Sequence, residues 1–177
     1  GLRYEGINQE AEVEVGSAGY MRAEGTQTLN DYWTISTSFE KNAFYLMPGS
    51  LYAVSGGNVG GMNVQWKNGD TTNAMLGYRY WALQNNNRQE IYGNVNQRLL
   101  TQYNYKVDIS GWVGNQQNSN SNVDYFSPIN QTVYTGTLNL RVLQWRDITT
   151  KKYDFWHRFY ASYGAVTQSG YITLPMN

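Results

Sequence analysis

A ladder of carboxylates near the start of the chain is the feature with the clearest chemical potential. Glu10, Glu12 and Glu14 alternate with small apolar residues. Successive side chains of a β-strand point to opposite faces, so a strand here places all three carboxylates on one face. Such a face attracts a cationic or hydroxyl-rich polymer if it lines a lumen, and otherwise it is an ordinary solvated strand face. Because like charges repel, we expect some of the glutamates to pair with cations from other strands. The candidate partners are Lys67, Arg79, Lys106, Arg141 and Arg158.

A second alternating run covers residues 102–113. One of its faces is mostly apolar, and the opposite face is mostly polar and includes Asn104, Lys106, Asp108 and Trp112. We predict that Asn104, Asp108 and Trp112 line the same polar path as the glutamate ladder. The cation Lys106 lies two residues from Asp108 on that face, which weakens the case for Asp108 as an attractive charge.

Other kinds of chemistry have little support in the sequence. The chain has no Cys and a single His, His157, without the spacing of a metal site. It contains no nucleophile elbow, phosphate loop or dinucleotide fingerprint. A zero formal net charge leaves no basic excess to hold a phosphate backbone, so we expect no nucleic-acid partner. A carboxylate pair for glycoside hydrolysis stays open, because such residues need only be close in space. We expect no enzyme activity, no cofactor and no metal.

Period-two alternation recurs along most of the chain and predicts β-strands. No stretch reaches the 18 or so apolar residues of a membrane helix, whereas a barrel strand needs only about 9–11 residues. We therefore predict an all-β fold, an antiparallel up-and-down transmembrane β-barrel of outer-membrane type. Residues 1–177 form a single barrel domain or a fragment of a larger barrel. The expected strands lie near 2–15, 20–28, 31–40, 60–67, 71–82, 90–98, 102–114, 133–145, 153–165 and 169–174.

Turn signals and aromatic residues support the same architecture. Tight turns are expected at 28–31 and 67–70, the latter a type I′ turn at Asn68-Gly69, and longer links at 41–59, 83–89 and 114–132. Many aromatic residues lie near the expected strand ends, where they would sit at the membrane interface. The alternative is that these rings form the core of a soluble β-sandwich. The residues are Tyr20, Tyr32, Trp33, Trp66, Trp81, Trp112, Trp145, Tyr153, Phe155 and Trp156.

The segment Asp124–Asn130 is the most distinctive short motif, with Tyr125, Phe126 and Pro128 at its centre. Tyr125-Phe-Ser-Pro128, followed by a long strand and Trp145, resembles a segment of bacterial exopolysaccharide export porins. This family includes the exporters of poly-β-1,6-N-acetylglucosamine, cellulose and related polymers. The chain resembles the poly-β-1,6-N-acetylglucosamine exporter most. Further similarities are Asn30-Asp-Tyr-Trp33, Ser38-Phe-Glu-Lys41, the stretch from Leu46 to Gly57, and Tyr153 to Gly170.

The resemblance implies a large barrel in the bacterial outer membrane that exports a biofilm exopolysaccharide, here poly-β-1,6-N-acetylglucosamine. It implies an acidic lumen suited to a partly deacetylated, cationic polymer, with Glu10, Glu12, Glu14 and Asp108 as candidates. The implied partners are the polysaccharide chain, outer-membrane lipid, a periplasmic deacetylase and an inner-membrane synthase complex. The chain ends at Leu174-Pro-Met-Asn177 without a terminal aromatic residue, so we expect a fragment. The alternative function is a carbohydrate-binding or structural module, either a small closed barrel or a soluble sandwich.

Overall fold

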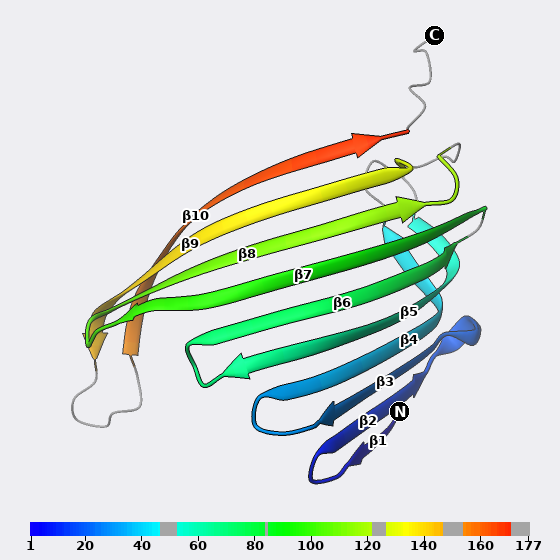
Figure 1. The fold of residues 1–177 in the computed structure, drawn as a ribbon. Helices are drawn as coiled ribbons and strands as arrows, with labels where there is room; N and C mark the ends of the chain where they lie inside the picture. The colour runs from blue at the N-terminus through cyan, green and yellow to red at the C-terminus, as the bar shows by residue number, and fades with distance from the viewer. Residues whose placement is uncertain (47–52, 84, 122–126, 147–153, 171–177) are drawn as a thin grey trace.

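Ten β-strands make up almost all of the computed structural model, which describes residues 1–46, 53–83, 85–121, 127–146 and 154–170. They form one sheet in which every strand is antiparallel to the next along the chain (Figure 1). The strands are β1 (Leu2–Glu5), β2 (Gln9–Val15), β3 (Met21–Thr28), β4 (Trp33–Leu46), β5 (Ala53–Asn68), β6 (Thr72–Leu83), β7 (Asn86–Thr101), β8 (Tyr105–Asn118), β9 (Asn130–Arg146) and β10 (Asp154–Ser169). The all-β, antiparallel, up-and-down fold predicted from alternation is confirmed.

The sheet is open, because within the described residues β1 pairs with β2 alone and β10 with β9 alone. Two stretches of the chain were divided into strands wrongly. The stretch 2–15 is a hairpin of β1 and β2, in which Gly6 N–H donates to the Gln9 carbonyl at 2.7 Å. The expected strands 153–165 and 169–174 are replaced by the single strand β10, and residues 171–174 lie outside the described part.

The connections divide between the two ends of the sheet. The turns β1–β2, β3–β4, β5–β6 and β7–β8 lie at one end, at the left of Figure 1. The links β2–β3, β4–β5, β6–β7 and β8–β9 lie at the other, which we call the loop end. The turn predicted at 67–70 is present, but it is not type I′ at Asn68-Gly69. Its centre is Gly69-Asp70, where Gly69 has a φ of 54° and Thr71 N–H donates to the Asn68 carbonyl at 3.3 Å.

The strand register gives the sheet an apolar face and a polar face. The outer face, as we call the apolar one, carries cross-strand rows such as Val64–Leu76–Gly93–Val113–Tyr134–Ala165. The inner face, as we call the polar one, carries rows such as Asn63–Gly77–Tyr92–Gly114–Val133 and Arg98–Asp108–Asn139. Neighbours in a row share a face because paired residues of adjacent strands point to the same side.

Exposure is reversed relative to a soluble protein. On the outer face Leu76 is 63% exposed and Leu138 is 50% exposed. On the inner face the side chains of Arg98 and Asp108 are only 24% and 18% exposed. Side chains crowd together on the concave side of a curved sheet and spread apart on its convex side, so the polar face is the concave one. This arrangement contradicts the soluble-sandwich alternative, in which apolar side chains fill a closed interior.

The apolar part of the outer face has the length of a membrane crossing. In β9 it extends from Tyr134 to Val142, close to the 9–11 or so residues that a tilted strand needs. Towards the loop end the outer face becomes polar, with Asn115, Gln117 and Thr132 in neighbouring positions. The strands therefore continue beyond the hydrocarbon layer at that end. Among the helical residues that the structure describes, none forms a helix long and apolar enough to cross a membrane.

Candidate substrate path on the inner face

Glu10, Glu12 and Glu14 lie together on the inner face of β2, as the alternation predicts. The register places Glu12 opposite Glu24 of β3 and Glu14 opposite Arg22. The strands β1–β4 thus form an acidic wall, which we define by the inner-face residues Glu5, Glu10, Glu12, Glu14, Glu24 and Glu40.

The cations that pair with this wall come from its own strands. Arg3 of β1 forms ion pairs with Glu5, at 2.7 Å, and with Glu10. Arg22 of β3 pairs with Glu24 at 2.6 Å and lies 3.8 Å from Glu40. The distant cations expected as partners do not supply these pairs. Arg3 was missed as a partner because residues 2–15 were predicted to form one strand. In the structure they form a hairpin that brings Arg3 next to Glu10.

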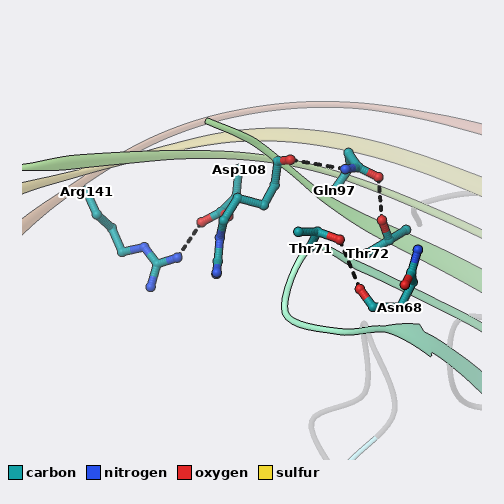
Figure 2. A network of polar contacts seen from close by, with 7 residues as sticks. Asn68, Thr71, Thr72, Gln97, Asp108 and Arg141 are labelled. Carbon is teal, nitrogen blue, oxygen red and sulfur yellow. Dashed lines mark hydrogen bonds and ion pairs between the residues drawn. The ribbon is translucent and has the colours of Figure 1, made fainter. Parts of the chain in front are cut away.

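Asp108 is held between two arginines near the start of β8. Arg98 Nε of β7 donates to Asp108 Oδ1 at 2.9 Å, and Arg141 of β9 donates to Asp108 Oδ2 at 2.6 Å. Figure 2 shows the Arg141 side chain reaching Asp108 from its own strand. Both oxygens of the carboxylate are therefore occupied by guanidinium donors. Lys106, two residues from Asp108 on the same face, takes no part in these two bonds.

Two large aromatic rings lie flat on the inner face over glycines. A Cβ at Gly77 would collide with the Tyr92 ring, and a Cβ at Gly114 would collide with the Trp112 ring. The Arg79 guanidinium lies over the Tyr92 ring, 4.5 Å from its centroid, and Tyr92 is only 5% exposed. Trp112 is on the inner face as predicted, opposite Asn94 and Thr135. Glycine at these positions is required for the rings to lie along the sheet instead of projecting into the lumen.

Trp81 and Trp156 also lie on the inner face and so do not belong to a lipid-facing girdle. Trp81 is only 8% exposed and lies beneath Arg88, whose guanidinium is 5.5 Å from the indole ring centroid. Trp33 and Trp66 do pair on the outer face, next to the turn end, as a membrane-interface position requires.

Asn104 lies in the β7–β8 turn, before β8 begins at Tyr105, and not within a strand as expected. Its carbonyl accepts a 2.7 Å hydrogen bond from Leu143 N–H, so its backbone still contacts β9.

The described end of the Tyr125–Pro128 motif, Ser127 and Pro128, is bonded to the neighbouring strands. Tyr125 and Phe126 lie outside the described residues, but Ser127 is 3% exposed and Pro128 is fully buried. Asn86 Nδ2 donates to Ser127 Oγ at 2.9 Å, and Asn118 Nδ2 donates to the Pro128 carbonyl at 2.6 Å. Asn86 and Asn118 are on the inner face by register, so Ser127 and Pro128 lie on the lumen side at the loop end.

The charges of the inner face are segregated across the sheet. The acidic wall occupies β1–β4. Cations predominate on β5–β10, where the inner face carries Lys67, Arg79, Arg88, Arg98, Lys106, Arg141, Arg146 and Arg158 against Glu90, Asp108 and Asp154. The neutral total charge therefore hides two walls of opposite sign. A polymer moving along such a surface meets ion pairs, amides, hydroxyls and aromatic rings, which are groups suited to sugar hydroxyls and charged substituents.

A separate groove of about 870 Å³ lies on the outer face. It is floored by small residues such as Ala74, Gly111 and Gly136 between the side chains of Trp66 and Tyr134. Because the outer face is the apolar one, this groove faces lipid and is not part of the inner path.

No group of acidic, His or Cys side chains with the arrangement of a metal site occurs in the part of the chain that the structure describes.

A curved antiparallel sheet with a lipid-facing apolar side and a crowded polar side defines the wall of a transmembrane β-barrel. The chain matches the family described as PgaA membrane beta barrel domain over residues 2–177, and it belongs to that family. The resemblance inferred from the Tyr125–Pro128 segment and the aromatic spacing is thereby confirmed, and the chain is placed in the bacterial outer membrane.

Among solved structures, the chain is similar to one described as "Bacterial polysaccharide outer membrane secretin". The two are 18% identical, with a TM-score of 0.74, and the match covers 94% of this chain and 59% of that one. The chain therefore spans somewhat more than half the length of that structure. No curated protein matches the chain.

Proposed function

We propose that this chain forms part of the wall of an outer-membrane pore that exports a biofilm exopolysaccharide, poly-β-1,6-N-acetylglucosamine. The observation that carries the proposal is the pairing of a polar, crowded inner face with an apolar, exposed outer face on the same ten strands. Membership of a membrane-barrel family supports the location, and the similar structure, which is described as a polysaccharide secretin, supports a polysaccharide as cargo.

Transport through such a path is passive and makes or breaks no covalent bond. Many weak sites along a lumen let a polymer bind and still move on, which is what conduction requires. The acidic wall of β1–β4 supplies attraction for free amino groups of a partly deacetylated polymer. Glu12 and Glu14 contribute to this attraction more than Glu10, because Glu10 is paired with Arg3. A periplasmic deacetylase and an inner-membrane synthase are the partners this function calls for.

The acidic ladder gives the first test. Replacing Glu10, Glu12 and Glu14 together by Lys reverses the charge of one strand face without adding bulk to the outer face. We expect secretion of the cationic polymer to fall by about tenfold or more, because the wall then repels the amines it attracts in the wild type. Secreted polymer is measured by immunoblot of culture medium in cells that express the variant.

Two comparisons make this test specific. The triple Gln variant removes the charge without reversing it and is expected to give an intermediate level. The variant Asp31→Lys changes a carboxylate in the exposed β3–β4 turn, away from the ladder, and is expected to secrete normally. Heat-modifiable migration on gels confirms that each barrel folds. Wild-type secretion by a folded triple Lys variant would remove the ladder from the mechanism.

A further inference from the structure

Three cations form a single cross-strand row on the inner face near the turn end. Lys106 of β8 is opposite Arg141 of β9, which is opposite Arg158 of β10. Like charges placed directly opposite each other on a sheet destabilise it, so the row needs a compensating anion. Asp108 is the carboxylate bonded to Arg141, but it is shared with Arg98. Asp154 is engaged by both Arg146 Nε and Arg146 Nη2, at 3.0 and 2.9 Å.

The row lines a cavity that has space for a ligand. Lys106, Arg141 and Arg158, together with Trp156, surround a volume of about 470 Å³. That volume lies within the range of about 300–1,000 Å³ typical of small-ligand sites. Trp156 is the fourth lining residue, and the Lys106 ammonium lies 5.3 Å from the centroid of its ring.

The donors in this cavity are not all used within the protein. Arg141 Nε is buried and has no hydrogen-bond partner, although Arg141 also bonds Asp108 through another nitrogen. A buried charged donor without a partner is costly. Guanidinium groups present paired donors that match a carboxylate, and an indole ring offers a flat surface on which a sugar ring stacks.

We propose that Lys106, Arg141, Arg158 and Trp156 form a binding site for an acid-substituted sugar unit. The anionic group lies among the three cations and the sugar ring lies against Trp156. The proposal rests on the proposed function, because the ligand reaches this cavity from the lumen. The acidic wall of β1–β4 and this site lie on different strands. An exported poly-β-1,6-N-acetylglucosamine chain that bears acidic substituents beside its free amines therefore contacts both.

Binding of tetrasaccharides that differ in charge tests the site directly. The intact protein in detergent is titrated calorimetrically with hyaluronan tetrasaccharide, which carries carboxylates, and with neutral N-acetylated chitotetraose. The amine form of chitotetraose is the cationic probe. We expect the acidic tetrasaccharide to bind about tenfold more tightly than the neutral one, with a preference that decreases as salt is raised.

Variants assign the binding to the named residues. Lys106→Met and Arg158→Met each keep an apolar stem and remove the charge. We expect each to weaken binding of the acidic tetrasaccharide by about tenfold and to leave binding of the neutral one unchanged. Lys67→Met removes an inner-face cation from β5, outside the cavity, and is expected to have no effect. Trp156→Leu is expected to weaken binding of the acidic tetrasaccharide but not binding of inorganic phosphate, which has no ring to stack.

Each alternative result overturns the proposal. Equal affinity for acidic and neutral tetrasaccharides, or insensitivity to Lys106→Met and Arg158→Met, shows that the row does not select acidic sugars. Inorganic phosphate binding as tightly as the tetrasaccharide, with no effect of Trp156→Leu, shows a simple anion site. Failure of the proposed function has a different signature. In that case the triple Lys variant of Glu10, Glu12 and Glu14 exports polymer at the wild-type level, while hyaluronan tetrasaccharide still binds.

Discussion

Charged residues of the inner face differ in the number of their ion-pair partners and in their exposure to solvent. Asp108 bonds two arginines and is 18% exposed, whereas Asp154 bonds one arginine and is 35% exposed. Water and salt screen the more exposed pair, so it contributes less to stability. Asp108 also joins three strands, β7, β8 and β9, because Arg98 and Arg141 come from its two neighbours. We therefore interpret Asp108 as a structural link in the wall more than as a free charge that attracts cargo.

The variant Asp108→Asn tests this interpretation. It keeps the shape but removes the charge, and we expect it to lower the free energy of unfolding by about 2 kcal/mol, the scale of hydrogen bonds to charged groups. Unfolding by urea in lipid vesicles, followed by tryptophan fluorescence, measures the change. The matched variant Asp154→Asn is expected to lose less than about 1 kcal/mol. Equal losses at the two positions would show that the double bridge has no special role.

At the scale of strands, close contact between rings and glycines sets the shape of the inner face. Tyr92 of β7 lies over Gly77 of β6 and is covered by Arg79. Trp112 of β8 lies over Gly114 of its own strand. Both rings therefore lie along the sheet, where they widen the free lumen. A side chain in place of either glycine pushes the ring away from the wall.

Gly77→Ala is expected to destabilise the barrel by about 1–3 kcal/mol, because the added methyl group overlaps the Tyr92 ring. The control is Gly136→Ala, where a Cβ meets no atom within 4 Å, and its expected effect is close to zero. In a Tyr92→Leu background the cost of Gly77→Ala should fall, since the ring that collides is gone. A cost that is the same in both backgrounds would contradict the ring-over-glycine contact. Urea unfolding in vesicles measures all four variants.

Strand boundaries could be predicted from the sequence only within the hydrocarbon layer. There one face meets lipid and the other meets the lumen, so alternation is strong, and β3 and β6 lie within about two residues of their expected limits. Towards the loop end both faces are wet and the alternation disappears. This is why Asn115–Asn118 was taken as a loop although it continues β8, with Gln89 Nε2 donating to Gln117 Oε1 at 2.8 Å.

Partners across strands were less predictable than faces. Alternation placed Glu10, Glu12, Glu14, Asp108 and Trp112 on the inner face, where the structure has them. Which cation meets which carboxylate depends on register, and register depends on turn lengths and on irregularities such as the shift between Arg98 and Leu100. The cavity of Lys106, Arg141, Arg158 and Trp156 was missed for the same reason. Its members are distant in sequence and become neighbours only through the pairing of three strands.

At the scale of the whole molecule, the two faces of the sheet meet different surroundings. The outer face has the exposed leucines, valines and aromatic rings of a surface in contact with lipid. Even the single histidine fits this arrangement, because His157 lies on that face between Phe155 and Phe159, with ring centroids 5.2 and 6.2 Å away. The inner face has the charges, amides and hydroxyls of a surface in contact with water and glycan. Every function proposed above depends on this separation.

Cysteine labelling along β9 tests the separation most directly, because the chain has no cysteine of its own. Single variants Thr137→Cys and Asn139→Cys lie on the inner face, and Leu138→Cys and Leu140→Cys on the outer face. In outer membranes treated with a water-soluble maleimide, we predict fast labelling at 137 and 139 and protection at 138 and 140 until detergent is added. Fast labelling at 138 and 140 with protection at 137 and 139 would contradict the account, since it would put water on the apolar side.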